Sequence, residues 1–233
     1  MVLTLPIREV LVATPRARIV RLDLDAQTFA FLAGQAVLVA PHGLPPRRAY
    51  SIACSPEESA DGRFLELLVG TEVSGQSGAP LTFDAGALVD LDGPIGRFTF
   101  PPQPQERRFL FVAGGTGVSP LRSMLHHALG IPHDEIGFLY SARTPDEFAY
   151  ESELKALAAA GRIEFRQTIT RDAAADSWQG RRGRLGRDDL APLIHATETL
   201  CFVCGPPPLV QDMLAALAEL GVARDRIKIE EWG

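Results

Sequence analysis

The sequence predicts two domains of different classes: an antiparallel β-barrel, then an α/β domain with a parallel five-stranded sheet and helices on both faces. About the first hundred of the 233 residues read as short strands separated by turns, whereas the remainder alternates apolar strands with helical patterns. A polar, proline-rich stretch at 102–108 separates the two patterns. We therefore expect domains at 1–101 and 109–233, joined by a linker at 102–108.

The strands of the first domain show mainly as alternation of apolar and polar residues with a period of two. This alternation marks 19–24, 64–69 and 96–100, and a short apolar run marks 36–40. Turn residues stand between the strands, at 33–34, 45–46, 61–62, 75–80 and 92–94. No helix longer than about two turns is expected there, a pattern typical of a small antiparallel barrel.

The second domain repeats a strand–helix unit. Apolar strands are predicted at 109–113, 136–140, 163–169, 200–204 and 227–230. Helices are predicted at 119–129, 146–160 and 207–220, with a short one at 187–194. Such units form a Rossmann-like parallel sheet that binds ligands at the carboxyl ends of its strands.

Composition excludes several classes of protein. The net charge of −6 argues against a nucleic-acid partner. Three cysteines provide neither a disulfide framework nor a four-ligand metal site, and the five histidines show no ligand spacing, so no metal is expected. No membrane span or signal peptide is evident, so we expect a cytoplasmic location without membrane association.

A glycine-rich turn at Gly114–Pro120 joins the strand at 109–113 to the next helix. Glycines let backbone N–H groups approach an anion, and the helix start adds N–H groups and a positive dipole end. Ser119 and Pro120 are expected to form the N-cap and first turn, although Pro120 stands where the dinucleotide fingerprint has Gly or Ala. The alternative is an ordinary tight turn. The residues expected to bind the cofactor here are Gly115, Thr116, Gly117, Ser119 and Pro120.

Five motifs, in order along the chain, resemble those of the ferredoxin–NADP reductase superfamily, in its bacterial form without a fused ferredoxin domain. They are Arg48-Ala49-Tyr50-Ser51, Gly93–Phe98, Gly114–Pro120, Cys204-Gly205-Pro206 and Ile229-Glu230-Glu231-Trp232. Each is weak alone, but their order and spacing cover essentially the whole chain. The resemblance implies a Greek-key FAD-binding barrel followed by an NAD(P)-binding domain.

The resemblance also implies flavin contacts in the first domain. Tyr50 would lie against the isoalloxazine ring, Arg48 would bind the pyrophosphate, and Ser51 would hydrogen-bond N5. A second phosphate element departs from the family, because Gly78 stands where a hydroxyl residue is usual; Gly75, Ser77 and Gly78 are its expected contacts. The alternatives are that Tyr50 is an ordinary barrel residue, that Arg48 is a surface arginine, and that the second element is an ordinary hairpin loop.

In the second domain, the resemblance places Cys204 beside the nicotinamide C4 atom and Glu230 near the flavin. Gly205 and Pro206 belong to the same nucleotide site, and Trp232 would cover the flavin ring. The alternatives are that the Cys204 thiol only packs in the core and that Glu230 is a solvated charge. The catalytic candidates are therefore Ser51, Cys204 and Glu230, whereas Cys201 is expected to pack in the core.

Two basic positions favour NADPH, with NADH left open. Arg143 follows the second strand, where NAD-binding proteins usually carry an acid for the ribose 2′-hydroxyl. Thr170-Arg171 follows the third strand and resembles a Ser-Arg pair that holds the 2′-phosphate in relatives. The alternative is a solvated basic loop.

The resemblance thus implies a monomeric FAD enzyme that takes hydride from NAD(P)H and passes single electrons to a separate acceptor, such as ferredoxin, flavodoxin or an oxygenase component. One alternative is a flavin or ferric-chelate reductase with a small-molecule acceptor. Another is an electron-transfer subunit that keeps FAD but does not use nicotinamide. A third, outside the resemblance, is an S-adenosylmethionine-type nucleotide domain with a barrel attached.

Overall fold

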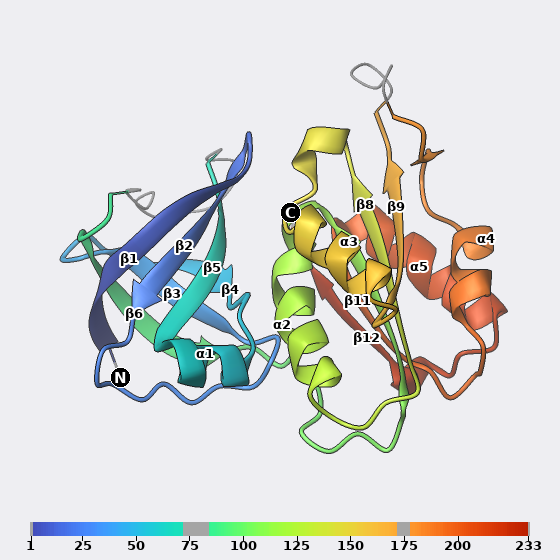
Figure 1. Cartoon of the computed structure of the whole chain (residues 1–233), viewed down its shortest axis with the longest axis horizontal. Coiled ribbons are helices and arrows are strands. Elements are labelled where there is room, and N and C mark those ends of the chain that lie inside the picture. Colours follow the sequence, from blue (N-terminus) through green and yellow to red (C-terminus); the bar gives the residue numbers. More distant parts are fainter. Residues whose placement is uncertain (1, 72–83, 172–177, 233) are drawn as a thin grey trace. The chain divides into compact units, whose positions relative to one another are not determined.

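The computed structural model describes residues 2–71, 84–171 and 178–232 (Figure 1). Contacts divide the chain into two compact units. Unit 1 comprises Met1–Pro102 and Arg122–His127, and unit 2 comprises Gln103–Leu121 and Ala128–Gly233. Arg122–His127 group with unit 1 through bonds such as the one that Ser123 Oγ donates to the Cys54 carbonyl at 2.7 Å.

Unit 1 contains a six-stranded antiparallel sheet in the order β4-β3-β6-β1-β2-β5. The strands are β1 (Val2–Thr14), β2 (Ala17–Asp23), β3 (Ala36–Pro41), β4 (Arg48–Ser51), β5 (Phe64–Gly70) and β6 (Leu88–Ile95). Among the described residues, one isolated bridge between Ile52 and Leu67 links the two edges. The predicted antiparallel architecture is confirmed, but the barrel-like sheet is not closed by a continuous ladder.

A short helix, α1 (Pro56–Gly62), interrupts the strands of unit 1. Ser55 and Glu58 form a reciprocal capping box at its start, and Pro56 occupies the first turn. Arg63 ends the helix in the left-handed conformation, with φ 57°. Asp61-Gly62, expected to be a turn between strands, therefore forms the last residues of this helix.

Unit 2 contains a parallel sheet in the order β10-β9-β8-β7-β11-β12. Its strands are β7 (Arg108–Gly114), β8 (Glu135–Ala142), β9 (Glu164–Ile169), β10 (Arg181–Arg182), β11 (Leu200–Gly205) and β12 (Ile227–Glu231). The five predicted strands are confirmed, and β10 adds a sixth at the edge. Because the strand order reverses between β7 and β11, their carboxyl ends form the switch point where such sheets bind ligands.

The helices of unit 2 fall close to the predicted positions. They are α2 (Val118–Leu129), α3 (Glu151–Ala159), α4 (Arg187–Leu190) and α5 (Pro207–Glu219), with 3₁₀ turns η1 (Gly115–Gly117), η2 (Pro145–Glu147), η3 (Ala191–Leu193) and η4 (Arg224–Arg226). The single helix expected at 146–160 is split into η2 and α3. The break falls at Phe148–Tyr150, where Phe148 is buried and Tyr150 has φ 60°.

Each face of the sheet in unit 2 has its own apolar layer. On one face, Leu110, Val112 and Val203 pack with residues of α4 and α5. On the other, four phenylalanines in matching register form a row across four strands: Phe202, Phe111, Phe138 and Phe165. Their ring centroids lie 5.4, 5.9 and 6.1 Å apart in that order. The first pair is stacked, the second tilted and the third edge-on, so the rings form a continuous aromatic layer across the strands.

Candidate functional site

In unit 1, the predicted flavin residues share the short strand β4. Arg48, Tyr50 and Ser51 are 8, 9 and 7% exposed. Alternation along a strand places Arg48 and Tyr50 on the same face, and their side chains are hydrogen-bonded. Burial raises the pKa of the Tyr50 phenol and the Arg48 guanidinium partly opposes the rise. The ring therefore stays neutral at physiological pH.

Arg47, which precedes this strand, is a binding candidate that the sequence analysis missed. Its Nε is buried and has no hydrogen-bond partner within the described parts of the chain. A buried unpaired polar atom of a cation is costly, so such an atom marks a place for an acceptor. With Arg48 beside it, the chemistry fits the anionic pyrophosphate of FAD. The only signal in the sequence was the arginine doublet itself.

The second predicted flavin-phosphate element, with Gly75, Ser77 and Gly78, lies outside the described residues.

In unit 2, the glycine turn lies at the carboxyl end of β7, as predicted. Gly115 has φ 56°, a conformation that residues with a side chain rarely adopt. A Cβ on Gly117 would lie 2.3 Å from the Cys204 carbonyl oxygen. Thr116 between them is exposed. The turn thus packs against the end of β11 on one side and leaves backbone accessible on the other.

The helix begins at Val118, one residue before the predicted bound of 119 and two residues before the start that an N-cap at Ser119 would give. The turn η1 runs directly into α2 at Val118, so Ser119 and Pro120 lie inside the first helical turn and Ser119 is not the N-cap. Gly114, in extended conformation, precedes the combined 3₁₀ and α segment. Pro120 is tolerated because N–H groups of the first turn need no partner within the helix. Ser119 is only 3% exposed.

The structure brings Cys204, Glu230 and Trp232 together at the ends of β11 and β12. Cys204 and Glu230 are register partners of the two strands. Trp232 Nε1 donates to the Glu230 carboxylate at 2.7 Å, and the Trp232 backbone N–H donates to the Gly205 carbonyl at 3.0 Å. Trp232 is therefore held at the ends of β11 and β12 by both its side chain and its backbone.

The electrostatics of this cluster follow from burial. Burial raises the pKa of the Cys204 thiol well above its usual value, and negative charge on Glu230 raises it further. Burial also raises the pKa of Glu230, partly opposed by the bond from Trp232. Cys204 is thus a neutral thiol beside a carboxylate. Cys201 packs in the core layer with α4 and α5, as expected.

Gly205 and Pro206 connect this cluster to α5. The backbone of Gly205 runs so close to Gly114 that a Cβ on Gly205 would lie 3.1 Å from the Gly114 Cα. Pro206 adopts extended conformation and caps the start of α5. These residues lie beside the glycine turn, as the predicted nucleotide site requires.

The residues predicted to select the nucleotide also lie together. Arg143 and Arg171 follow β8 and β9, and the Arg171 N–H donates to the Arg143 carbonyl at 2.9 Å. The Thr170 N–H donates to the Ala142 carbonyl, also at 2.9 Å. Both arginine side chains are exposed. Two exposed arginines at neighbouring strand ends are residues of the kind that bind a phosphate monoester, so the prediction that they select the nucleotide stays open to test.

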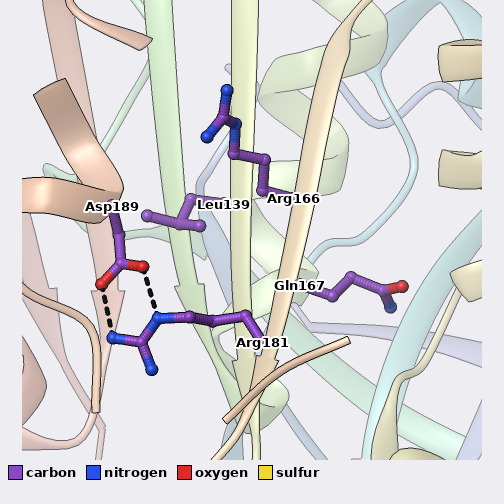
Figure 2. A pocket seen from close by; sticks show the side chains of 5 residues that line it. All are labelled: Leu139, Arg166, Gln167, Arg181 and Asp189. Carbon is purple, nitrogen blue, oxygen red and sulfur yellow. Dashed lines mark hydrogen bonds and ion pairs between the residues drawn. The ribbon is translucent and has the colours of Figure 1, made fainter. Parts of the chain in front are cut away.

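Unit 2 also has an open pocket of about 330 Å³, which the sequence did not predict; Figure 2 shows the side chains that line it. Its lining residues are Leu139, Arg166, Gln167, Arg181 and Asp189. Both carboxylate oxygens of Asp189 accept from Arg181, at 2.7 and 2.9 Å. Arg181 also donates to the carbonyls of Arg182 and Arg184, so it holds its own loop together rather than offering a free guanidinium.

An antiparallel barrel-like sheet followed by a Rossmann-like unit with a glycine turn at its switch point defines a class of nicotinamide-nucleotide oxidoreductases. The family model described as the oxidoreductase NAD-binding domain matches residues 111–214. The chain is 38% identical to ferredoxin–NADP reductase B of Sorangium cellulosum (strain So ce56) over 221 residues, which cover 89% of this chain and 88% of that protein. The chain belongs to the ferredoxin–NADP reductase family of FAD-containing NAD(P)H oxidoreductases.

More distant similarities support the same family. The chain is 29% identical to NADH-cytochrome b5 reductase 2 of Scheffersomyces stipitis over 156 residues, covering 60% of this chain and 52% of that protein. A solved structure of the ferredoxin reductase in carbazole 1,9a-dioxygenase superposes with a TM-score of 0.82 at 25% identity, covering 100% of this chain and 70% of that one.

The predicted family, fold class and enzyme class are therefore confirmed, as are FAD and NADP as the cofactors of the family. The individual site residues remain predictions. Among the helices that the structure describes, none has the length and apolar character needed to cross a membrane.

Proposed function

We propose that this enzyme transfers hydride from NADPH to FAD and passes electrons singly to a separate acceptor protein. The observation that carries the proposal is the intact glycine turn at the switch point, beside the Cys204–Glu230–Trp232 cluster. FAD, when bound, accepts two electrons as a hydride and releases them one at a time. Nothing in this chemistry requires a nucleophile or a general acid–base pair.

The flavin would be held by β4. Arg48 and Arg47 supply cationic donors for the pyrophosphate, and Tyr50 offers its ring to the isoalloxazine. Ser51 supplies the hydrogen bond at N5. All of these residues belong to one short segment, so a single strand positions both the ring and the phosphates.

The nicotinamide nucleotide would be held by unit 2. The backbone of Gly115–Gly117 binds the pyrophosphate, and Arg143, Thr170 and Arg171 bind the 2′-phosphate of NADPH. Cys204 presents a small neutral group to the nicotinamide ring, and Glu230 supplies a carboxylate next to it. Trp232 bonds Glu230 and would cover the flavin ring when FAD is bound.

The names of two relatives support an iron–sulfur protein as the acceptor. Ferredoxin–NADP reductase B and the ferredoxin reductase in carbazole 1,9a-dioxygenase both name ferredoxin. We infer that the acceptor is a ferredoxin or the iron–sulfur component of an oxygenase, and that the enzyme acts as a monomer. NADH-cytochrome b5 reductase 2 supports NADH as the second candidate donor.

The proposal is tested by the absorbance spectrum of the purified protein before and after anaerobic NADPH, and then NADH. A yellow protein that is bleached by the nucleotide supports it; a colourless protein that takes up no FAD, or a flavin that neither nucleotide reduces, contradicts it. Steady-state rates with ferredoxin plus cytochrome c, compared with free FMN or ferric citrate, then separate a protein acceptor from a small-molecule acceptor.

Replacing Tyr50 with alanine should weaken FAD retention by about 1–3 kcal/mol, because an aromatic contact to the ring is lost. FAD released by acid is measured by chromatography, and the dissociation constant by titrating the apoprotein. The core also loses a ring, so thermal unfolding of the apoprotein is compared in parallel. Retention equal to that of the parent would show that another residue stacks on the flavin.

Replacing Cys204 with alanine should slow flavin reduction at saturating NADPH with little change in nucleotide affinity. Cys204 ends β11 beside the glycine turn, but the turn approaches its backbone carbonyl, and the proposal assigns the thiol to the nicotinamide ring, so its contact belongs to the hydride step. Because the thiol stays neutral, the limiting rate should show no thiol ionisation between about pH 6 and 9. Stopped-flow absorbance measures both; an unchanged limiting rate with a raised dissociation constant contradicts the assignment. Cys201→Ala, in the core, is the matched control for loss of a buried thiol.

A further inference from the structure

Tyr140 is a buried residue of unit 2 whose hydroxyl reaches the glycine turn. Its side chain is 0% exposed, and its hydroxyl donates to the Gly115 carbonyl at 3.0 Å. Tyr140 is the register partner of Ala113, one residue before β7 ends at Gly114. A hydroxyl from the neighbouring strand thus bonds the first residue of the turn.

Aromatic neighbours and a backbone hydrogen bond from Ala149 hold the Tyr140 ring and its oxygen in place. The ring of Phe148 meets that of Tyr140 edge-on, with centroids 4.9 Å apart and planes at 78°. Trp178 stacks on the other ring of this pair, Phe148, at 5.7 Å and 23°. Burial raises the pKa of the phenol, so the hydroxyl keeps its proton. It is a permanent donor in a fixed place.

The bond controls the direction of one backbone N–H. The peptide that joins Gly115 to Thr116 is planar, so its carbonyl and its N–H point in opposite directions. The Gly115 carbonyl accepts from Tyr140 and from the Val118 N–H, and this fixes the plane. A Cβ at Gly115 would have nothing within 4 Å, so side-chain packing does not hold this glycine.

We propose that Tyr140 is a positioning residue, which holds the Gly115–Thr116 peptide so that the Thr116 N–H faces the pyrophosphate of the nicotinamide nucleotide. The proposal rests on the proposed function for its ligand. The fixed peptide itself is a property of the protein without nucleotide. The two can therefore be tested apart.

The test uses the FAD-loaded Tyr140→Phe variant, which keeps the ring and loses the hydroxyl. NADP⁺ affinity should fall about three- to tenfold, the effect of losing one neutral hydrogen bond. Affinity for 2′-AMP, which lacks the pyrophosphate, should stay at the parental value, and so should FAD content. Without nucleotide, hydrogen exchange at the Val118 amide, which donates to the same Gly115 carbonyl, should quicken.

Thr199→Val is the matched control. Thr199 is 2% exposed and its hydroxyl donates to the Ala196 carbonyl at 2.7 Å, at the amino end of β11. The Thr199→Val variant loses an equivalent hydroxyl–carbonyl hydrogen bond at the opposite end of the sheet. NADP⁺ affinity and hydrogen exchange in the glycine turn should therefore not change in this variant. Equal weakening of NADP⁺ binding in both variants would overturn the proposal, as would parental affinity with parental exchange in Tyr140→Phe. If the parent binds no NADP⁺, the proposed function fails, and the exchange rates alone decide whether Tyr140 fixes the turn.

Discussion

Replacing Gly117 with alanine should abolish nucleotide binding and destabilise unit 2 by about 2–3 kcal/mol, as overpacking against backbone typically does. The added Cβ would lie 2.3 Å from the Cys204 carbonyl oxygen, 2.6 Å from its carbonyl carbon and 3.0 Å from the Gly205 nitrogen. None of these atoms belongs to a flexible side chain, so the turn and β11 must separate. Urea unfolding and titration with NADP⁺ measure the two effects.

Gly115→Ala is the matched control for this prediction. The space around a Cβ at Gly115 is open, and only its φ of 56° opposes a side chain. We expect about 1–2 kcal/mol of destabilisation from that conformation. The FAD content of both variants should remain parental, since the flavin residues lie on β4. Parental NADP⁺ affinity in Gly117→Ala would show that the turn does not need its close approach to β11.

The double change Arg143→Ala with Arg171→Ala should abolish a preference for NADPH over NADH. Two charge-assisted contacts of about 1.5–3 kcal/mol each, reduced by solvent exposure, correspond to a preference of about ten- to a hundredfold. NADH kinetics should stay nearly intact, because NADH has no 2′-phosphate. The concentration dependence of flavin reduction by each nucleotide measures this.

Rising salt should erode the same preference in the parent, because screening weakens exposed ion pairs. Arg166→Ala is the control, since this exposed arginine of unit 2 pairs with Glu164 and not with the strand ends. It should leave the preference unchanged. Equal apparent affinities for NADPH and NADH in the parent would contradict the assignment of Arg143 and Arg171, and a parent that favours NADH would reverse it.

Periodicity and turn residues were sufficient to predict the two architectures, because burial on one face repeats along every long element. Short strands and local backbone conformations could not be predicted, because too few residues form them to show a periodic pattern. The strand β10 has only two residues and shows no period. The helix expected at 146–160 breaks at Tyr150, whose left-handed backbone is a local conformation that no helical pattern reveals.

Site residues could be predicted where they come directly after a predicted strand. Arg143 and Arg171 come directly after neighbouring parallel strands, so their meeting follows from topology. Tyr140 could not be predicted as a site residue, because a tyrosine within an apolar strand is usually a core residue. Only its hydrogen bond to the Gly115 carbonyl connects it to the glycine turn. Arg47 could not be predicted either, because burial of a single nitrogen atom depends on tertiary packing.

The strand β4 is an edge strand of the described sheet, since β3 pairs with it on one side and, among the residues that the structure describes, one isolated bridge, Ile52–Leu67, lies just beyond its end on the other. Edge segments with few backbone bonds open locally at a lower free energy than strands in the middle of a sheet. A ligand that binds only the closed form suppresses such opening by mass action. Bound FAD would therefore suppress local opening of β4. In the apoprotein, the residues that bind the flavin should be the first to lose order.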